Sequence, residues 1–203
     1  MKTLNATKVA LMTAALIMTV GSQPMFAQAE RKLREVRPLP TGYVVKKTTP
    51  KSNDRVGQSK QTLRSLIDSG RICRLLSNEQ LAALIQVECS GRNGLIGDKH
   101  LGEGNFAYGV LQIRQVYVDD VNERYGTDLR ASECLLDIEL SKLVTQAYMN
   151  RYGKSNFSFE HYARMHNGGP QGWNSKYSKT YAKTTRYWTK VQKALATIQV
   201  ASR

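Results

Sequence analysis

Residues 77–94 read SNEQLAALIQVECSGRNG, and the spacing of their apolar side chains decides how this part of the chain folds. Leu81, Leu84 and Ile85 fall at positions i, i+3 and i+4, which predicts a helix with one apolar face. Glu88 follows at i+7 and therefore continues that face. The pattern predicts a helix that carries a carboxylic acid where a leucine would ordinarily lie.

The inward position of Glu88 has a chemical consequence. Apolar surroundings disfavour the charged form of a carboxylic acid, so the group keeps its proton more readily and becomes a proton donor. Cleavage of a glycosidic bond needs such a donor, because the leaving sugar oxygen must be protonated as the bond breaks. The alternative is that Glu88 ends the helix and turns its side chain to solvent, as many glutamates do.

The first 29 residues have the layout of a secretory signal peptide. Lys2 and Lys8 precede a continuous apolar run, VALMTAALIMTV, and Ala27-Gln28-Ala29 forms a small-x-small cleavage site. The apolar run is 12 residues long, too short to span a bilayer comfortably, which argues against a membrane anchor. We therefore expect a secreted or periplasmic protein.

The chain is strongly basic, with a formal net charge of +14. Removal of Lys2 and Lys8 with the signal peptide leaves 28 basic and 16 acidic side chains, a net charge of +12. Such a charge favours an anionic partner: nucleic acid, a lipid surface or an acidic cell-wall polymer. For an exported protein, the wall polymer is the most accessible of the three.

The cysteines and histidines predict no cofactor. Cys73, Cys89 and Cys134 remain after signal removal, so one disulfide and one free thiol are expected, with the pairing open. His161 and His166 have no cysteine or suitable carboxylate spacing near them, so no metal site is expected.

The rest of the chain predicts a charged arm followed by one domain. Residues 30–59 mix charges with three prolines and show no sustained period, which is typical of a linker. Residues 60–203 predict an α+β fold that is mainly α, with a small irregular or β lobe at 90–109. Ser77 and Gln80 fit a capping box, and Gly70, Gly126 and Gly153 are stop signals. Helices are expected at 59–70, 77–88, 114–126, 137–153, 159–166 and from Thr184 to about Ile198.

Several short blocks occur in an order that resembles a known family. They are VECSGRN at 87–93, AYGVLQI at 107–113, YMNRYGK at 148–154, YARMHNGGPQGW at 162–173 and YWTKVQ at 187–192. Together they resemble the lysozyme-like superfamily, and most closely the invertebrate-type (destabilase-type) lysozymes. Some of the blocks are shared with soluble lytic transglycosylases and goose-type lysozymes. The resemblance covers roughly residues 73 to 193 and implies a lysozyme-like helical domain.

The resemblance also implies roles for individual residues. Glu88 matches the general acid at the end of the first core helix, and Ser90 beside it is a candidate to hydrogen-bond the carboxyl group or a sugar. Three further sets are expected to line the sugar site: the Gly-x-x-Gln-Ile block of Gly109, Gln112 and Ile113; the opposite wall of His166, Asn167, Gly168, Gly169 and Pro170; and the stacking rings of Tyr108, Tyr162 and Trp173.

The second carboxylate of the family has no clean match here. The chain is about three residues longer between Glu88 and AYGVLQI, and Leu101 falls near the expected aspartate, which leaves Asp98 and Glu103 as candidates. A separation from Glu88 of roughly 5 Å would suit a retaining double displacement, and roughly 6.5–9.5 Å would suit inversion. If neither is close, Glu88 would act with help from the substrate's N-acetyl group, as in lytic transglycosylases.

Three functions follow as hypotheses. The first is a secreted muramidase that cleaves β-1,4 bonds between N-acetylmuramic acid and N-acetylglucosamine, by hydrolysis or by a transglycosylase reaction that forms 1,6-anhydro-muramoyl ends. The second is a lysozyme-like protein that binds peptidoglycan without turnover, suggested by Cys89 beside the acid and by the unmatched carboxylate. The third, nucleic-acid binding, has only the charge in its favour and no recognisable motif. The expected partner is peptidoglycan, and the expected state is a monomer.

Overall fold

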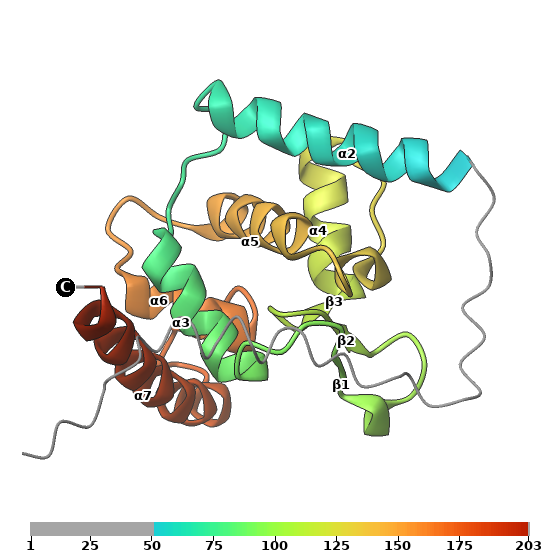
Figure 1. Ribbon diagram of the computed structural model, residues 1–203. Coiled ribbons are helices and arrows are strands. Elements are labelled where there is room, and N and C mark those ends of the chain that lie inside the picture. The colour runs from blue at the N-terminus through green and yellow to red at the C-terminus, as the bar shows by residue number, and fades with distance from the viewer. Residues whose placement is uncertain (1–50, 203) are drawn as a thin grey trace, which may run out of the picture.

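A computed structural model describes residues 51–202, which form a helical domain with a small β lobe (Figure 1). The fold class predicted from the sequence, α+β and mainly α, is confirmed. The helices are α2 (Lys51–Asp68), α3 (Asn78–Cys89), α4 (Gln115–Tyr125), α5 (Ile138–Tyr152), α6 (Phe159–Gly168) and α7 (Ser178–Ala201), with 3-10 turns η1 (Lys99–Leu101) and η2 (Ala131–Cys134). The strands are β1 (Ile96–Gly97), β2 (Ala107–Tyr108) and β3 (Ile113–Arg114).

The predicted capping box fixes the start of α3. The Gln80 backbone N–H donates to the Ser77 hydroxyl, and the Ser77 backbone N–H donates to the Gln80 side chain at 2.9 Å. The helix then buries Leu81 and Leu84, as its spacing predicted. It ends at Ser90, whose left-handed backbone (φ 53°) stops the helix and turns the chain into the lobe.

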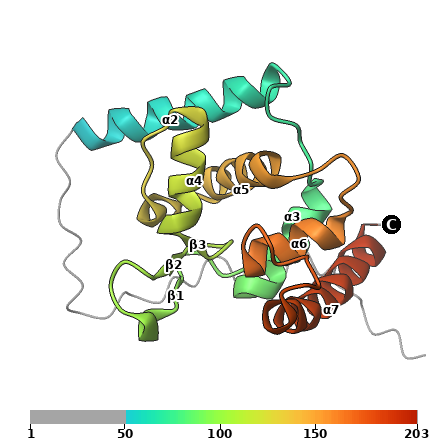
Figure 2. The same ribbon diagram turned by 180° about the vertical axis from the view of Figure 1, so that it is seen from behind.

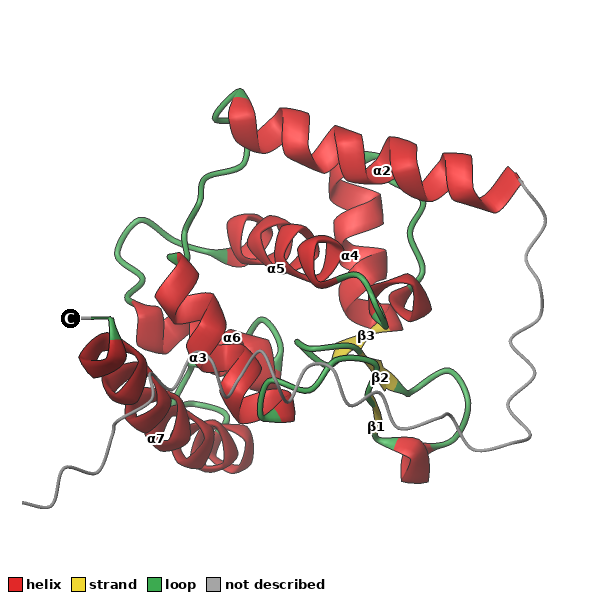
Figure 3. Ribbon diagram, in the orientation of Figure 1, coloured by secondary structure: helices red, strands yellow, loops and turns green. Residues whose placement is uncertain are grey.

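The lobe after α3 is a three-stranded antiparallel sheet in the order β1-β2-β3 (Figure 3). Gly109, just after β2, has φ 73°, and a Cβ there would meet the Cys134 carbonyl oxygen at 2.1 Å. Only glycine allows this close approach between the lobe and η2. The expected lobe is therefore present, and its contact with η2 ties it to the helical body.

Helix α7 packs along both α3 and α6, and Figure 2 shows the same three helices grouped together from behind. Helix α5 lies between this group and α2 (Figure 1), and it buries the predicted face that includes Leu140, Val144 and Ala147. The core therefore lies between the α3–α6–α7 group, α5 and α4.

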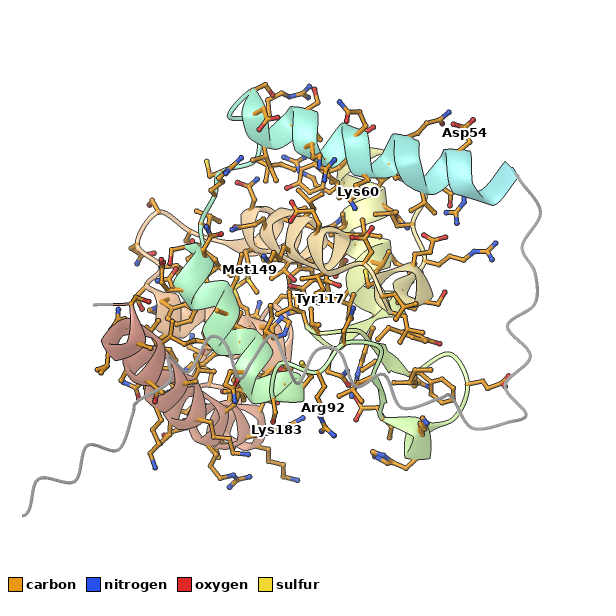
Figure 4. The ribbon with its side chains drawn as sticks, in the orientation of Figure 1. Asp54, Lys60, Arg92, Tyr117, Met149 and Lys183 are labelled. Atoms are coloured by element: carbon orange, nitrogen blue, oxygen red, sulfur yellow. The ribbon has the colours of Figure 1, made fainter. Side chains whose placement is uncertain are left out.

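Helix α2 begins at Lys51, eight residues before the expected start at Ser59. Long-range ion pairs hold this part of the helix: Arg55 pairs with Asp128 at 3.3 Å and with Glu133. Lys60, labelled in Figure 4, donates to the Asp137 carboxylate at 2.6 Å. The expected linker at 30–59 is thus corrected for residues 51–59, while the expected signal peptide and residues 30–50 lie outside the described residues.

Two other helices are longer than expected. Helix α7 starts at Ser178 rather than Thr184, because no glycine or proline interrupts the sequence from there to Ala201. Helix α6 runs two residues past His166 and ends at Gly168. The following Gly169, at φ 76°, is where the chain leaves the helix.

The expected disulfide is wrong for this structure, because all three cysteines are free thiols. Cys73 is exposed, whereas Cys89 and Cys134 are buried in the core. Burial raises the pKa of Cys89 and raises the pKa of Cys134 to about 12. Both buried cysteines therefore act as small hydrophobic side chains rather than as reactive thiolates.

Candidate active site

Glu88 lies in the last turn of α3, and its side chain faces other protein groups rather than bulk water. The side chain is 18% exposed, and one carboxylate oxygen lies 3.5 Å from Nε2 of His166 at the end of α6. The alternative in which Glu88 turns freely to solvent is therefore wrong. The inward position followed from the helical spacing, and the contact with α6 is the tertiary interaction that keeps it there.

His166 joins three of the five sequence blocks that carry the family resemblance. Its ring contacts Glu88 of the first block and interacts with the backbone of Leu111 in the second, while His166 itself belongs to the fourth, YARMHNGGPQGW. Burial lowers the pKa of His166, although the Glu88 carboxylate and the Leu111 backbone oppose this. The imidazole is therefore neutral near neutral pH, and it contacts Glu88 without a full positive charge.

Two tyrosines that the sequence did not single out complete the surroundings of Glu88. Tyr187 on α7 is 7% exposed, and burial, followed by the Glu88 carboxylate, raises its pKa well above 10. Tyr117 on α4 lies in the centre of the molecule (Figure 4); it stacks on Tyr148 with ring centroids 3.6 Å apart and meets the His166 ring edge-on. Both hydroxyls have polar neighbours: that of Tyr187 interacts with the Glu88 carboxylate, and that of Tyr117 interacts with the Thr145 side chain. The acid is thus surrounded by polar groups from α4, α6 and α7.

A signal for Tyr187 does exist in the sequence. Thr184, Tyr187 and Val191 are three and four residues apart and share the buried face of α7. A phenolic hydroxyl is unexpected on a buried helix face, just as the Glu88 carboxyl group is unexpected on the apolar face of α3. The periodicity argument that identified the acid would therefore also identify this tyrosine.

Glycines allow the HNGGP turn (residues 166–170) and the residues after it to pack closely. A Cβ at Gly168 would meet the Thr184 methyl group of α7 at 2.5 Å, and one at Gly172 would meet the Arg164 carbonyl oxygen of α6 at 2.3 Å. The Asn167 side-chain oxygen is buried and accepts no hydrogen bond from the described residues. The turn therefore brings one unused acceptor, next to His166, into the neighbourhood of Glu88.

The residues of the Gly-x-x-Gln-Ile block make contacts inside the lobe and with the core. Gln112 has φ 48°, and its amide donates to the carbonyl oxygens of Gly109 at 2.8 Å and Leu95 at 3.4 Å. Its amide oxygen lies so close to Gly97 that a Cβ there would come within 2.0 Å. Ile113 is 1% exposed and belongs to the core. The expectation that Ile113 offers its side chain to a sugar is corrected, because that side chain is buried in the core. Gln112 is half-buried and uses its amide N–H groups to shape the lobe, and a role for it in sugar binding stays a prediction.

The two candidate second carboxylates have different surroundings. Asp98, with φ 55°, accepts from Arg114 Nε at 3.0 Å and forms an ion pair with that guanidinium. Glu103 is exposed and forms no hydrogen bond or ion pair with any described residue. In the described residues, neither carboxylate forms a hydrogen bond or ion pair with Glu88, whose own carboxylate lies 3.5 Å from the neutral His166 ring. The Ser90 hydroxyl is exposed and does not bond the Glu88 carboxyl group, which leaves it free for a ligand.

The candidate stacking rings differ in how much surface they offer. Tyr162 is 5% exposed, so its expected role in stacking is corrected to core packing. Trp173 is half-buried: its indole N–H donates to the Pro170 carbonyl at 2.9 Å, and Lys154 lies 5.0 Å from its ring centroid. Tyr108 is half-buried on β2, opposite Ile113. Tyr108 and Trp173 therefore keep surface that a ligand could use.

Three further observations concern the described residues as a whole. Among residues 51–202, no helix is long and apolar enough to cross a membrane. The same residues hold no group of three histidine, cysteine or acidic side chains that could bind a metal ion. A cavity of about 370 Å³ lies at the opposite end of α3 from Glu88, lined by Ser77, Glu79, Gln80, Leu195, Gln199 and Ser202.

Comparison with known proteins finds lysozymes. An invertebrate-type lysozyme of Ruditapes philippinarum is 36% identical over 93 residues, which are 44% of this chain and 62% of that protein. A lysozyme of Magallana gigas is 36% identical over 95 residues, 45% of this chain and 63% of that protein. The chain thus spans about three fifths of the length of these two relatives. No family model matches the chain.

The coverage is more complete for a lysozyme of Meretrix lusoria, which is 30% identical over 122 residues, 59% of this chain and 90% of that protein. The crystal structure of Tapes japonica lysozyme is 28% identical, with a TM-score of 0.48, and the match covers 59% of this chain and 90% of that one. The family resemblance of the sequence blocks is confirmed by the sequence matches. The chain belongs to the invertebrate-type lysozyme family.

Proposed function

We propose that this protein is an exported muramidase that cleaves the β-1,4 bond between N-acetylmuramic acid and N-acetylglucosamine in peptidoglycan, with Glu88 as the general acid. The observation that carries the proposal is the position of Glu88. Its carboxyl group is largely shielded at the end of α3 and lies against His166, which also meets the Leu111 backbone. The names of the relatives, all lysozymes, support a glycosidase of this class.

In this proposal the Glu88 carboxyl group gives its proton to the glycosidic oxygen as the carbon–oxygen bond breaks. Positive charge then develops on the sugar ring, and the resulting Glu88 carboxylate lies close enough to stabilise it. A water molecule deprotonated by Glu88 can complete hydrolysis. The exposed Ser90 hydroxyl is the group that we assign to sugar binding.

The test is mass spectrometry of fragments released from purified cell walls by the full chain. Hydrolysis predicts soluble muropeptides that end in a reducing N-acetylmuramic acid, and Glu88→Gln should release none above a sample without protein. Release by Glu88→Gln at the parent rate would reject Glu88 as the acid. Binding of the walls with no released fragment, by a parent protein whose folding is verified, would reject catalysis.

A second candidate is a lytic transglycosylase, which forms a 1,6-anhydro-muramoyl end. It is favoured by one observation: the Asp98 carboxylate is already paired with the Arg114 guanidinium, and Glu103 is exposed and held by no other described side chain. A single carboxyl group suits a route in which the substrate's N-acetyl group assists. The same mass spectra separate the two reactions, because the anhydro product is lighter than the hydrolysis product by one water.

A further inference from the structure

Helix α7 carries a single row of positive charges on its outer surface. Five basic residues follow one another at intervals of four, three, four and three, which places them on one side of the helix. We name these residues the α7 stripe: Lys179, Lys183, Arg186, Lys190 and Lys193. All five are exposed, and none of their side chains forms an ion pair or hydrogen bond within residues 51–202.

No acidic side chain lies nearby in the sequence to balance this row. Glu160 is the last acidic residue of the chain, and α7 contains none. The α7 stripe extends over about 21 Å, at 1.5 Å per residue. The buried Thr184, Tyr187 and Val191 occupy the other side of the helix, and Figure 4 shows Lys183 at the outer edge of the molecule. The stripe is therefore a continuous cationic surface rather than a set of scattered charges.

The side chains beside the stripe indicate which class of anion it fits. A helix that lies on a membrane places large apolar residues next to its lysines, but the exposed large apolar residues of this region, Tyr177 and Val200, lie beyond the two ends of the stripe. Proteins that bind single-stranded nucleic acid offer aromatic rings for base stacking. Here Trp188 packs edge-on against Phe159, and Tyr187 is buried.

What remains beside the cations is small and polar. Ala182, Thr185, Thr189 and Gln192 are exposed between the basic residues. Neighbouring cations at i+3 and i+4 are about 5–6 Å apart, which suits a flexible chain with one negative charge in each short repeat. The Gln192 amide, and the Thr189 hydroxyl as an acceptor, can hydrogen-bond a polyol.

We propose that the α7 stripe binds a linear polyol phosphate carried by the cell wall. The choice of a cell-wall polymer as the ligand rests on the proposed function. Binding of that polymer to the α7 stripe does not itself require catalysis. Tyr187 lies on the inner side of the same helix, near Glu88, so a polymer held on the outer side keeps the wall close to Glu88 without occupying its surroundings. The site thus acts as an anchor that is separate from the acid.

The test measures binding of the full chain to poly(glycerol phosphate) free of peptidoglycan. The variant carries Lys183→Gln, Arg186→Gln, Lys190→Gln and Lys193→Gln, because glutamine keeps the helix propensity and removes the charge. The matched control carries four exposed cations from other elements: Arg64→Gln, Arg71→Gln, Lys99→Gln and Arg124→Gln. Circular dichroism verifies the folding of all three proteins.

We expect the stripe variant to lose affinity on the order of 100-fold at moderate salt, because each removed cation gives up a several-fold electrostatic gain. Its slope of log affinity against log salt should fall by about 0.7 for each phosphate that is no longer neutralised, or roughly three for the four removed cations. The control should keep its affinity within a few-fold. Glu88→Gln should bind as the parent does, which separates this result from the test of catalysis.

Several results would overturn the proposal. Equal loss of affinity in the control variant would mean that net charge alone decides binding. Parent-like affinity in the stripe variant would place the polymer elsewhere. Tighter binding of anionic phospholipid vesicles or of single-stranded DNA than of poly(glycerol phosphate) would assign the stripe to a membrane or a nucleic acid instead.

Discussion

Glu88 and Asp98 are close in the sequence, but they belong to regions that are built in different ways. Glu88 ends a helix in the α3–α6–α7 group and is surrounded by His166, Tyr117 and Tyr187, which come from three other helices. Asp98 lies in the β lobe, with a third of its side chain exposed, and pairs with Arg114 of the same lobe. In the helical region Glu88 has no cationic partner among the described residues, whereas in the lobe Asp98 is paired with a guanidinium.

This difference indicates which of the two regions should carry out the reaction. Glu88 lies beside a neutral imidazole and phenols that keep their protons, so no fixed positive charge within residues 51–202 pairs with it and a ligand can compete for its hydrogen bonds. A carboxylate that accepts two hydrogen bonds from a guanidinium, as Asp98 does from Arg114, is held in one position. We therefore expect the helical region to supply the reaction and the lobe to supply shape.

The largest difference in the rate of muropeptide release should appear between Glu88→Gln and Asp98→Asn. Removal of a general acid costs about 10²–10⁴ in rate, and we expect about 10³ for Glu88→Gln in the release of soluble muropeptides. Asp98→Asn loses one lobe ion pair, and its rate should stay within about tenfold of the parent. A loss of rate in Asp98→Asn as large as that in Glu88→Gln would make Asp98 a direct participant in the reaction.

The next largest effect should be on stability, at the contact between the lobe and η2. Gly109→Ala places a methyl group against the Cys134 carbonyl oxygen at φ 73° and should cost about 3 kcal/mol in urea unfolding. Gly126→Ala is the matched control: its φ is 66°, but its Cβ would meet open space, so only about 1 kcal/mol of backbone strain is expected. Equal losses of unfolding free energy in the two variants would show that the close approach of Gly109 to η2 does not affect stability.

Tyr187→Phe should have a smaller effect, and mainly on activity. Loss of the hydroxyl that faces Glu88 should lower the rate about tenfold and change its pH profile, because the phenol helps to position the acid. The free energy of unfolding should fall by no more than about 1 kcal/mol, because at most one hydrogen bond is lost. Tyr177→Phe, at an exposed tyrosine, is the control, and an unchanged rate in Tyr187→Phe would remove Tyr187 from the site.

The smallest effect should be a dependence of stability on pH that originates at His166. Its pKa is lower in the folded protein than the ordinary value of 6.5, so between those two values the unfolded chain binds more protons. The stabilising contribution is complete above pH 6.5 and is lost as the pH falls through 6.5 toward the folded value. His166→Gln should remove this slope from urea unfolding, whereas His100→Gln, at an exposed histidine, should keep it.

Local spacing in the sequence was enough to predict much of this molecule. The capping residues of α3 and the inward position of Glu88 follow from interactions between residues three and four apart, which a sequence shows directly. The lobe follows from the concentration of glycine after α3. These features depend little on the rest of the fold.

Features that depend on distant contacts could not be predicted in this way. The early start of α2 is supported by Arg55, whose partners Asp128 and Glu133 lie far along the chain. The Gln112 amide can bond either a ligand or its own backbone, and only the folded lobe shows that it donates to Gly109 and Leu95. The hydrogen-bond partners of a polar side chain thus depend on which groups the fold brings close to it.

The most direct test of Glu88 as the acid is a crystal structure of Glu88→Gln with an intact oligomer of alternating N-acetylglucosamine and N-acetylmuramic acid. We predict a glycosidic oxygen within about 2.6–3.2 Å of the side chain at position 88, with sugar contacts to Ser90 and to the turn at 166–170. An oligomer bound elsewhere, for example in the cavity between Ser77 and Ser202 at the other end of α3, would contradict this prediction.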